Sequence, residues 1–91
     1  MELSIVIVNY NTRKMTLDCI NSIIKNTKSI KFEIIVIDNA SSDDSLRALK
    51  ELNLKIKNLE LIENKINRGF GKANNQAMKI AKSRYILLLN S

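Results

Sequence analysis

The sequence contains no histidine, proline or tryptophan, and its only cysteine is Cys19. Without histidine, the chain cannot form a Ser-His-Asp or Cys-His catalytic centre or a histidine-ligated zinc site. A single cysteine excludes an internal disulfide and fits a reducing compartment, which predicts a cytoplasmic location. Any metal site in this chain would therefore use carboxylates and a hard cation.

Long apolar runs are also missing. No run approaches the ~18 residues that are needed to cross a bilayer, so the sequence predicts no membrane span. Hydrophobic residues still make up 45% of the 91 residues. This length and composition predict one small globular domain with a thin margin of stability.

Acidic residues are absent from 65–84, in a chain whose net charge is +6. The basic residues of this segment are Lys65, Arg68, Lys72, Lys79, Lys82 and Arg84. Such a patch suits a phosphate, a nucleic acid or an anionic membrane surface, or is simply a solvated helix face. Because aromatic stacking platforms and a recognised nucleic-acid motif are lacking, we expect no nucleic-acid partner.

Four apolar, β-branched segments alternate with three amphipathic ones, which predicts an α/β domain with a parallel sheet. The expected strands are Leu3–Tyr10, Phe32–Asp38, Leu59–Glu63 and Arg84–Asn90, and the expected helices fall within 11–27, 40–52 and 72–82. We expect Thr12 to cap the first helix and Ser41 to cap the second.

Right-handed crossovers restrict the topology of such a chain. The predicted strand order is 3-2-1-4, with the first two helices on one face of the sheet and the third on the other. A ligand crevice is then expected at the carboxyl ends of the strands, between the first and the fourth. The fourth strand carries Leu87–Leu89 at a sheet edge without a charge. This edge predicts either a larger sheet or pairing with a second copy in a homo-oligomer.

Two loop features are candidates for ligand binding. "GFGKAN" lacks the third glycine of a dinucleotide fingerprint and follows the third strand, so Gly69 and Gly71 predict a tight turn before a helix N-terminus. Asp38 ends the second strand, where its carboxylate could accept hydrogen bonds from a ribose or a base, or cap its own turn. The residues alone leave these two roles of Asp38 open.

Three segments together resemble the N-terminal half of the inverting family-2 glycosyltransferases of GT-A fold, in particular a rhamnosyltransferase-like branch. They are "SIVIVNYN", "EIIVIDNASSDDS" and "ENKINRGFGKANNQAMKIAKSRYILLLN". The resemblance implies a Rossmann-like domain that binds the nucleotide part of a nucleotide-diphosphate sugar of UDP or dTDP type.

The resemblance also implies which residues contact the nucleotide. Those after the first strand are Asn9, Tyr10 and Asn11, and those after the second are Asp38, which binds the base, with Asn39 and Ser41. The segment that closes over the base and ribose supplies Arg68, Gly69, Phe70 and Asn74.

In that family, the strand matching "YILLLN" leads into a short acidic DxD motif that holds Mn or Mg, and the catalytic base follows further on. Residues 1–91 end with Asn90-Ser91 before either element. We therefore expect a partial domain that binds no metal and lacks catalysis by itself. The full-length enzyme would transfer a sugar to a hydroxyl with inversion, in the cytoplasm or peripheral to the inner membrane face. The alternative is a stand-alone nucleotide-binding or self-associating module.

Overall fold

The computed structural model describes residues 2–90, without the side chain of Asn90. The elements are β1 (Leu3–Asn9), α1 (Arg13–Asn26), β2 (Phe32–Asn39), α2 (Ser45–Lys55), β3 (Leu59–Asn64), α3 (Phe70–Ile80) and β4 (Tyr85–Asn90). The strands form one parallel sheet in the order β3-β2-β1-β4. The predicted α/β class and strand order are confirmed. The prediction that Asn90-Ser91 directly precede a metal motif lies outside the described residues.

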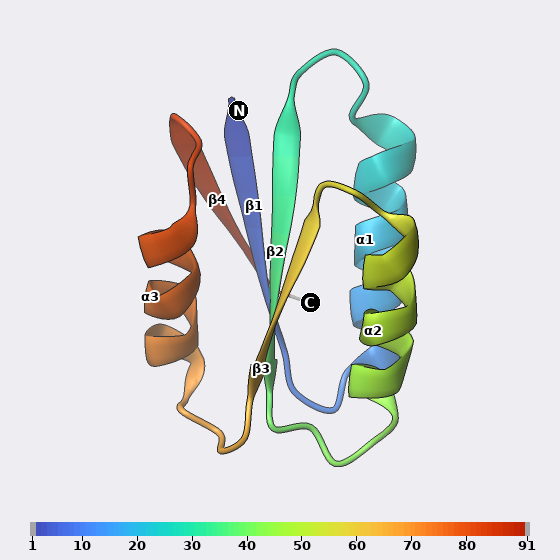
Figure 1. Ribbon diagram of the computed structural model, residues 1–91, viewed down its shortest axis with the longest axis vertical. Helices are drawn as coiled ribbons and strands as arrows, with labels where there is room; N and C mark the ends of the chain where they lie inside the picture. Colours follow the sequence, from blue (N-terminus) through green and yellow to red (C-terminus); the bar gives the residue numbers. More distant parts are fainter. Residues whose placement is uncertain (1, 91) are drawn as a thin grey trace.

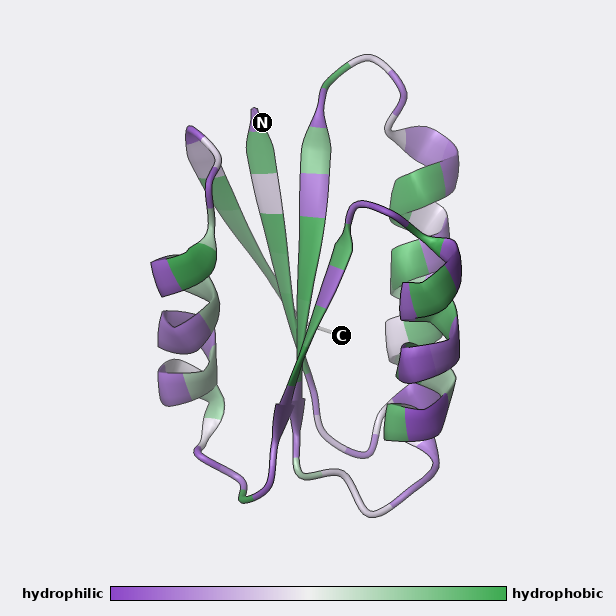
Figure 2. Cartoon of the chain, viewed as in Figure 1, coloured by the Kyte–Doolittle hydropathy of each residue, from purple (hydrophilic) through white to green (hydrophobic). Residues whose placement is uncertain are grey.

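The sheet lies between two helical layers. Helices α1 and α2 cover one face, and α3 covers the other, as Figure 1 shows. The loops that follow β1, β2 and β3 gather at the same end of the sheet, at the bottom of that view. In Figure 2 the strand bodies are mainly hydrophobic, whereas hydrophilic residues follow the strand ends and loops.

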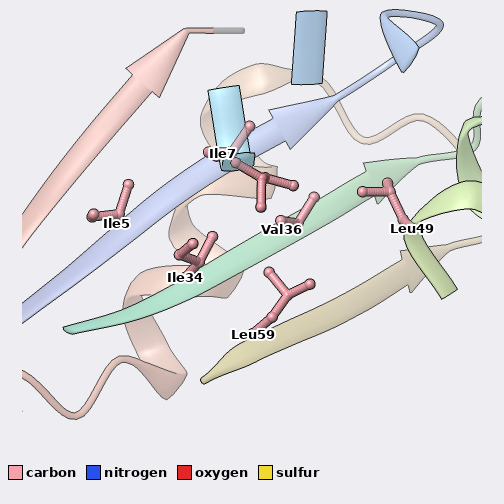
Figure 3. Close-up of a cluster of buried hydrophobic side chains, with 7 residues drawn as sticks. Ile5, Ile7, Ile34, Val36, Leu49 and Leu59 are labelled. Atoms are coloured by element: carbon pink, nitrogen blue, oxygen red, sulfur yellow. The ribbon is translucent and has the colours of Figure 1, made fainter. Parts of the chain in front are cut away.

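The larger core fills the space between the sheet and helices α1 and α2. Its buried members are Ile5, Ile7, Ile20, Ile34, Val36, Leu49 and Leu59. Figure 3 shows how the side chains from β1, β2 and β3 gather on one face with Leu49 of α2. Alternate residues of each strand point to one face, so the other half of each apolar strand must be covered by α3.

The core beneath α3 is smaller because a single helix covers it. Val6, Val8, Ile35 and Ile37 pack there against small residues of α3, Ala73 and Ala77, and all six are buried. Alanines allow α3 to approach the sheet closely, which brings its N-terminus to the carboxyl ends of the strands. No helix among residues 2–90 combines the length and apolarity required to cross a membrane.

Strand β4 is the least covered element of the sheet. Among residues 2–90 it pairs with β1 alone, and Ile86, Leu87 and Leu88 are 41%, 44% and 45% exposed. These neighbours point alternately to the two faces, so both faces of β4 are open. The edge that the sequence predicts is therefore present and apolar.

The helix starts differ from prediction in three places. Thr12 holds the cap position of α1, but its hydroxyl accepts no hydrogen bond from the first turn and instead donates to Asn9 Oδ1 at 3.0 Å. The cap position of α2 is Asp44, whose side chain makes no capping hydrogen bond, and the Ser41 hydroxyl instead donates to Asp38. Helix α3 begins at Phe70, two residues before the predicted start, after Gly69 at φ 81°. Side chains at the strand ends compete for these hydroxyls, which local cap patterns do not reveal.

Glu33 fastens the connection between α3 and β4 to the far end of the sheet. Its carboxylate accepts hydrogen bonds from the Ser4 hydroxyl and from the Lys82 backbone N–H, the latter at 3.0 Å. Partial burial raises the pKa of Glu33, but these hydrogen bonds and the charge of Lys82 outweigh it and hold the pKa below its ordinary value of 4.5. The ionised carboxylate therefore stabilises this connection.

Acid should weaken this connection. Because the folded pKa of Glu33 lies below the unfolded one, its stabilisation is present above the unfolded pKa and is lost as the pH falls through the folded pKa. We expect the free energy of unfolding to fall as the pH drops below 4.5, and to fall less steeply in Glu33→Gln. Urea denaturation across about pH 3 to 6 measures this. Glu60→Gln, an exposed carboxylate of β3, is the matched control; equal pH dependence in both variants would contradict the assignment.

Candidate functional site

A pocket of about 450 Å³ opens at the carboxyl ends of the strands. Its lining residues are Val8, Tyr10, Thr12, Asn39, Asn67, Gly69 and Phe70. They come from β1 and its loop, from the end of β2, and from the loop before α3. The predicted crevice is therefore at the expected end of the sheet. It lies over β1, β2 and the β3–α3 loop, however, and no side chain that the structure describes on β4 lines it.

The pocket wall is aromatic and uncharged. Tyr10 and Phe70 are 48% and 51% exposed, so about half of the surface of each residue is accessible to a ligand. None of the seven lining residues carries a formal charge. Such a wall suits a flat, neutral, partly polar group, such as a heterocyclic ring, better than it suits a phosphate.

Beside the pocket, Asn9 joins the first two loops through a buried polar brace. Its Nδ2 donates to Asp38 Oδ1 at 2.8 Å and to Ser41 Oγ at 3.1 Å. Its Oδ1 accepts from Thr12 and Thr16 hydroxyls at 3.0 and 2.7 Å. Asn9 is fully buried, and its hydrogen bonds to Asp38 and Thr16 form away from water. This brace fixes the loop that carries Tyr10.

Asp38 belongs to the same brace. Besides Asn9, it accepts from Ser41 Oγ at 2.7 Å and from Ser41 N–H at 3.2 Å. It is only 1% exposed and does not line the pocket. Of the two roles that the residues left open, the geometry favours the turn cap. Asp38 would then shape the site through its neighbours.

Asn11 continues this junction at the surface. Its backbone adopts the left-handed conformation at φ 54°, which asparagine tolerates better than most residues. In that conformation its N–H donates to Ser41 Oγ, and its Oδ1 accepts from the N–H groups of Ser42 at 2.7 Å and Asp43 at 3.2 Å. Asn11 therefore joins the loop after β1 to the loop after β2 and fixes the position of its neighbour Tyr10.

Asn39, at the end of β2, organises the loop before α3. Its Nδ2 donates to Asn67 Oδ1 at 2.9 Å and to the Gly69 carbonyl at 3.3 Å. Its Oδ1 accepts from Arg68 N–H at 3.0 Å and from Asn64 Nδ2 at 3.2 Å. Gln76 of α3 then pairs reciprocally with Asn64 at 2.7 and 2.9 Å. The chain of amides ties β2, β3, α3 and the pocket loop into one unit.

Arg68 and Asn74 also lie outside the pocket wall. Arg68 is exposed and enters the network through its backbone N–H. Asn74 is 5% exposed on α3, and its Oδ1 lacks a hydrogen-bond partner among the residues that the structure describes. A buried acceptor without a partner is costly, so Asn74 is suited to receive a hydrogen bond from a group outside these residues.

The predicted residues thus fall into separate sets. Those that line the pocket are Tyr10, Asn39, Gly69 and Phe70. Those that brace its loops are Asn9, Asn11, Asp38 and Ser41. Sequence reasoning missed Val8, Thr12 and Asn67 in the wall and the Asn64–Gln76 pair behind it. The signal available for Asn67 was its position two residues before Gly69.

The described residues offer no cluster of metal ligands. Nowhere in residues 2–90 do three histidine, cysteine, aspartate or glutamate side chains lie close enough together to hold an ion. The carboxylate at the site, Asp38, already accepts three hydrogen bonds. These residues do not fit a divalent metal, and no catalytic step through one can be derived from them.

The sequence is similar to a known protein family. The model of the family described as glycosyl transferase family 2 matches residues 4–91. The poly(ribitol-phosphate) beta-glucosyltransferase of Bacillus spizizenii is 39% identical over 93 residues, which cover 100% of this chain and 15% of that protein. The chain therefore spans about a seventh of that relative's length.

Solved structures agree with the fold. The crystal structure of Staphylococcus aureus TarS in complex with UDP aligns at a TM-score of 0.86 with 29% identity, over 100% of this chain and 27% of that chain. The mannosyltransferase PcManGT of Pyrobaculum calidifontis, in complex with GDP-Man and Mn²⁺, aligns at 0.87 with 22% identity, over 98% of this chain and 27% of that one. At that identity the second structure supports the fold alone.

Proposed function

The chain belongs to glycosyl transferase family 2, and from this premise we propose that residues 1–91 bind the nucleotide part of a nucleotide-diphosphate sugar. The observation that carries the proposal is the uncharged pocket between Tyr10 and Phe70 at the carboxyl ends of the strands. The UDP complex of TarS supports this proposal, because all of this chain aligns with part of the TarS structure. The narrower resemblance to a rhamnosyltransferase-like branch stays a prediction.

We assign three roles to the residues of the site: contact with the base, support of the loops, and contact with the ribose or diphosphate. Tyr10 and Phe70 stack on the base, while Gly69 and Asn39 complete the wall around it. Asn9, Asn11, Asp38 and Ser41 hold the two loops in place. Arg68 and Asn74 contact the ribose or diphosphate side of the ligand. The aromatic wall receives the base, so the charged diphosphate extends out of the pocket toward solvent.

The full-length protein, on this proposal, is an inverting glycosyltransferase that acts on a hydroxyl acceptor. A general base would remove the acceptor proton, and a divalent metal would neutralise the leaving diphosphate. Neither group is assigned within residues 2–90. The domain 1–91 is therefore proposed as the nucleotide-binding part of a cytoplasmic enzyme, a location that the single Cys19 supports.

Calorimetric titration of the 91-residue chain with UDP tests the proposal. We expect saturable binding that is the same with manganese and with EDTA, because the base pocket is present and the described residues lack a metal cluster. Inorganic pyrophosphate, which has the charge but no base, should bind at least about fivefold more weakly if stacking supplies 1 kcal/mol or more. Absence of UDP binding by a chain that is folded by circular dichroism would refute the proposal.

A self-associating module is the second candidate, and the open β4 edge favours it. Ile86, Leu87 and Leu88 leave apolar surface on both faces of an edge strand, a common site of strand pairing between chains. Light scattering distinguishes the candidates: self-association through β4 requires a dimer that Leu88→Lys disrupts, whereas nucleotide binding requires only a monomer.

A further inference from the structure

The net charge of the chain is concentrated in the segment that contains α3. Residues 65–84 carry six basic residues and no acidic one, whereas the nine basic residues outside this segment equal the nine acidic residues of the chain in number. The segment is the whole connection between β3 and β4, with α3 in its middle. Helix α3 lies alone on its face of the sheet, so no other helix of residues 2–90 covers its outer side (Figure 1).

These positive charges are not paired within the described part of the chain. The basic members of the ion pairs among residues 2–90 all belong to α1 or α2 and are Arg13, Lys14, Arg47 and Lys50. None of the six basic side chains of 65–84 forms an ion pair with a carboxylate of residues 2–90. Lys82 acts on the Glu33 carboxylate through its charge without pairing with it. The α1–α2 side of the molecule therefore pairs acids with bases, whereas the α3 side leaves its cations for an outside partner.

The unpaired cations lie along α3 and at both of its ends. Lys72 and Lys79 are two helical turns apart, so they share one face of α3. Both are exposed, whereas Ala73 and Ala77 are buried against the sheet. The loop before α3 and the connection after it supply two exposed cations each. We call the whole set the basic α3 surface, and its members are Lys65, Arg68, Lys72, Lys79, Lys82 and Arg84.

Exposed apolar side chains lie in the same segment as these cations. Ile66, Met78 and Ile80 are exposed, and none of them belongs to either buried core. The Tyr85 ring, also exposed, lies 6.0 Å from the Arg84 guanidinium. Interfacial segments combine cations with apolar side chains in this way, because the apolar groups enter the headgroup layer while the cations attract anionic lipids. Aliphatic side chains offer no stacking surface to a nucleic-acid base. An anionic bilayer therefore matches the surface better than a nucleic acid does.

We propose that the basic α3 surface docks on an anionic lipid bilayer, with the axis of α3 parallel to the membrane plane. Each lysine or arginine held near such a surface strengthens binding about fivefold, and cations at both ends of α3 keep its axis along the surface. Docking of this kind requires no membrane-spanning helix. Gly69 and Phe70 line the pocket at the N-terminal end of α3, so this orientation places the pocket opening beside the lipid headgroups.

Co-sedimentation of the 91-residue chain with lipid vesicles tests the proposal. We expect binding to vesicles of two parts phosphatidylcholine and one part phosphatidylglycerol, and at least about tenfold weaker binding to phosphatidylcholine alone. Raising sodium chloride from about 0.1 M to about 0.5 M should weaken binding to the anionic vesicles, because salt screens the attraction. Equal binding to both kinds of vesicle, or no binding by a chain that is folded by circular dichroism, would overturn the proposal. The vesicles carry no nucleotide, so this result is independent of the nucleotide site.

Two double variants locate the docking surface. Lys72→Gln with Lys79→Gln should weaken binding to the anionic vesicles about 10- to 30-fold. Lys25→Gln with Lys55→Gln removes the same net charge from the last turns of α1 and α2, on the opposite face of the sheet, and should change binding by no more than about twofold. All four lysines are exposed, so both variants should fold. Equal losses in the two variants would mean that net charge alone holds the chain on lipid, and the α3 surface would be excluded.

Met78→Ser tests the apolar part of the surface. We expect it to weaken binding to the anionic vesicles about 3- to 10-fold, because less apolar area enters the headgroup layer. Ile66→Ser, in the exposed loop before α3, gives the same readout if the helix variant is unstable. Binding that neither substitution changes would overturn the lipid assignment. A DNA oligonucleotide that binds more tightly than the vesicles, with the same dependence on Lys72 and Lys79, would assign the surface to nucleic acid instead.

Discussion

Asp38→Ala is expected to lower the free energy of unfolding by about 3 kcal/mol or more. The carboxylate is 1% exposed and accepts hydrogen bonds from Asn9 Nδ2, Ser41 Oγ and Ser41 N–H. Alanine would leave buried donors facing an empty space, and each unsatisfied donor costs about 1–3 kcal/mol. A domain of this size has roughly 5 kcal/mol in total, so the variant should be close to unfolding at room temperature. Urea denaturation followed by circular dichroism measures the change.

Asp18→Ala is the matched control. It removes an aspartate whose carboxylate pairs with Lys14 at 2.8 Å, but this pair is exposed and one turn apart on α1. Its loss should change the free energy of unfolding by no more than about 0.5 kcal/mol. If Asp38→Ala were as mild as this control but lost UDP binding, Asp38 would be a direct ligand of the base, and the brace described here would be the wrong account of it.

Phe70→Ala is expected to weaken UDP binding by about 5- to 150-fold, the range for losing one base-stacking ring at 1–3 kcal/mol. Phe70 lines the pocket at the first residue of α3 and is 51% exposed, so its ring contributes little to either core. The free energy of unfolding should therefore change by less than about 1 kcal/mol. Calorimetric titration with UDP gives the affinity, and denaturation of the same sample gives the stability.

Two further variants make the Phe70 experiment decisive. Phe70→Tyr retains the ring and should keep UDP affinity within about threefold of wild type. Ile66→Ala truncates another exposed apolar residue of the same loop, one that does not line the pocket, and should leave affinity unchanged. A Phe70→Ala chain that binds UDP as tightly as wild type would exclude stacking on this ring.

The architecture could be predicted because it depends on repeated signals. Each strand is a run of β-branched or leucine residues, and each intervening segment is amphipathic, so the α/β class follows from many residues at once. The handedness of crossovers then leaves few topologies, and the order β3-β2-β1-β4 is the one observed. Element ends were less certain, since α3 starts at Phe70 where the positive φ of Gly69 allows the chain to turn early.

The site could be located from the sequence but not resolved into roles. Asp38 and Asn39 are neighbours at a strand end, and nothing local indicates that the aspartate is enclosed by the brace while the asparagine faces the pocket. Strand residues alternate between faces, so that difference depends on which loop covers which face. Asn67 shows the same limit, because its Oδ1 accepts hydrogen bonds from residues that lie 28 and 2 positions away in the chain.

The position of β4 in the sheet also affects the order in which we expect the strands to pair during folding. Its pairing joins Leu3 to Tyr85 and Ile7 to Leu89, so the central strand β1 must wait for almost the whole chain before it gains its second neighbour. Pairs so far apart in sequence close late, because the loop entropy is lost before any contact repays it. Strands β1, β2 and β3 can associate first, with α1 and α2 packed on them. We expect α3 to pack on this sheet afterwards, because α3 follows β3 in the chain, so the pocket that Gly69 and Phe70 help to line would form after these three strands have paired.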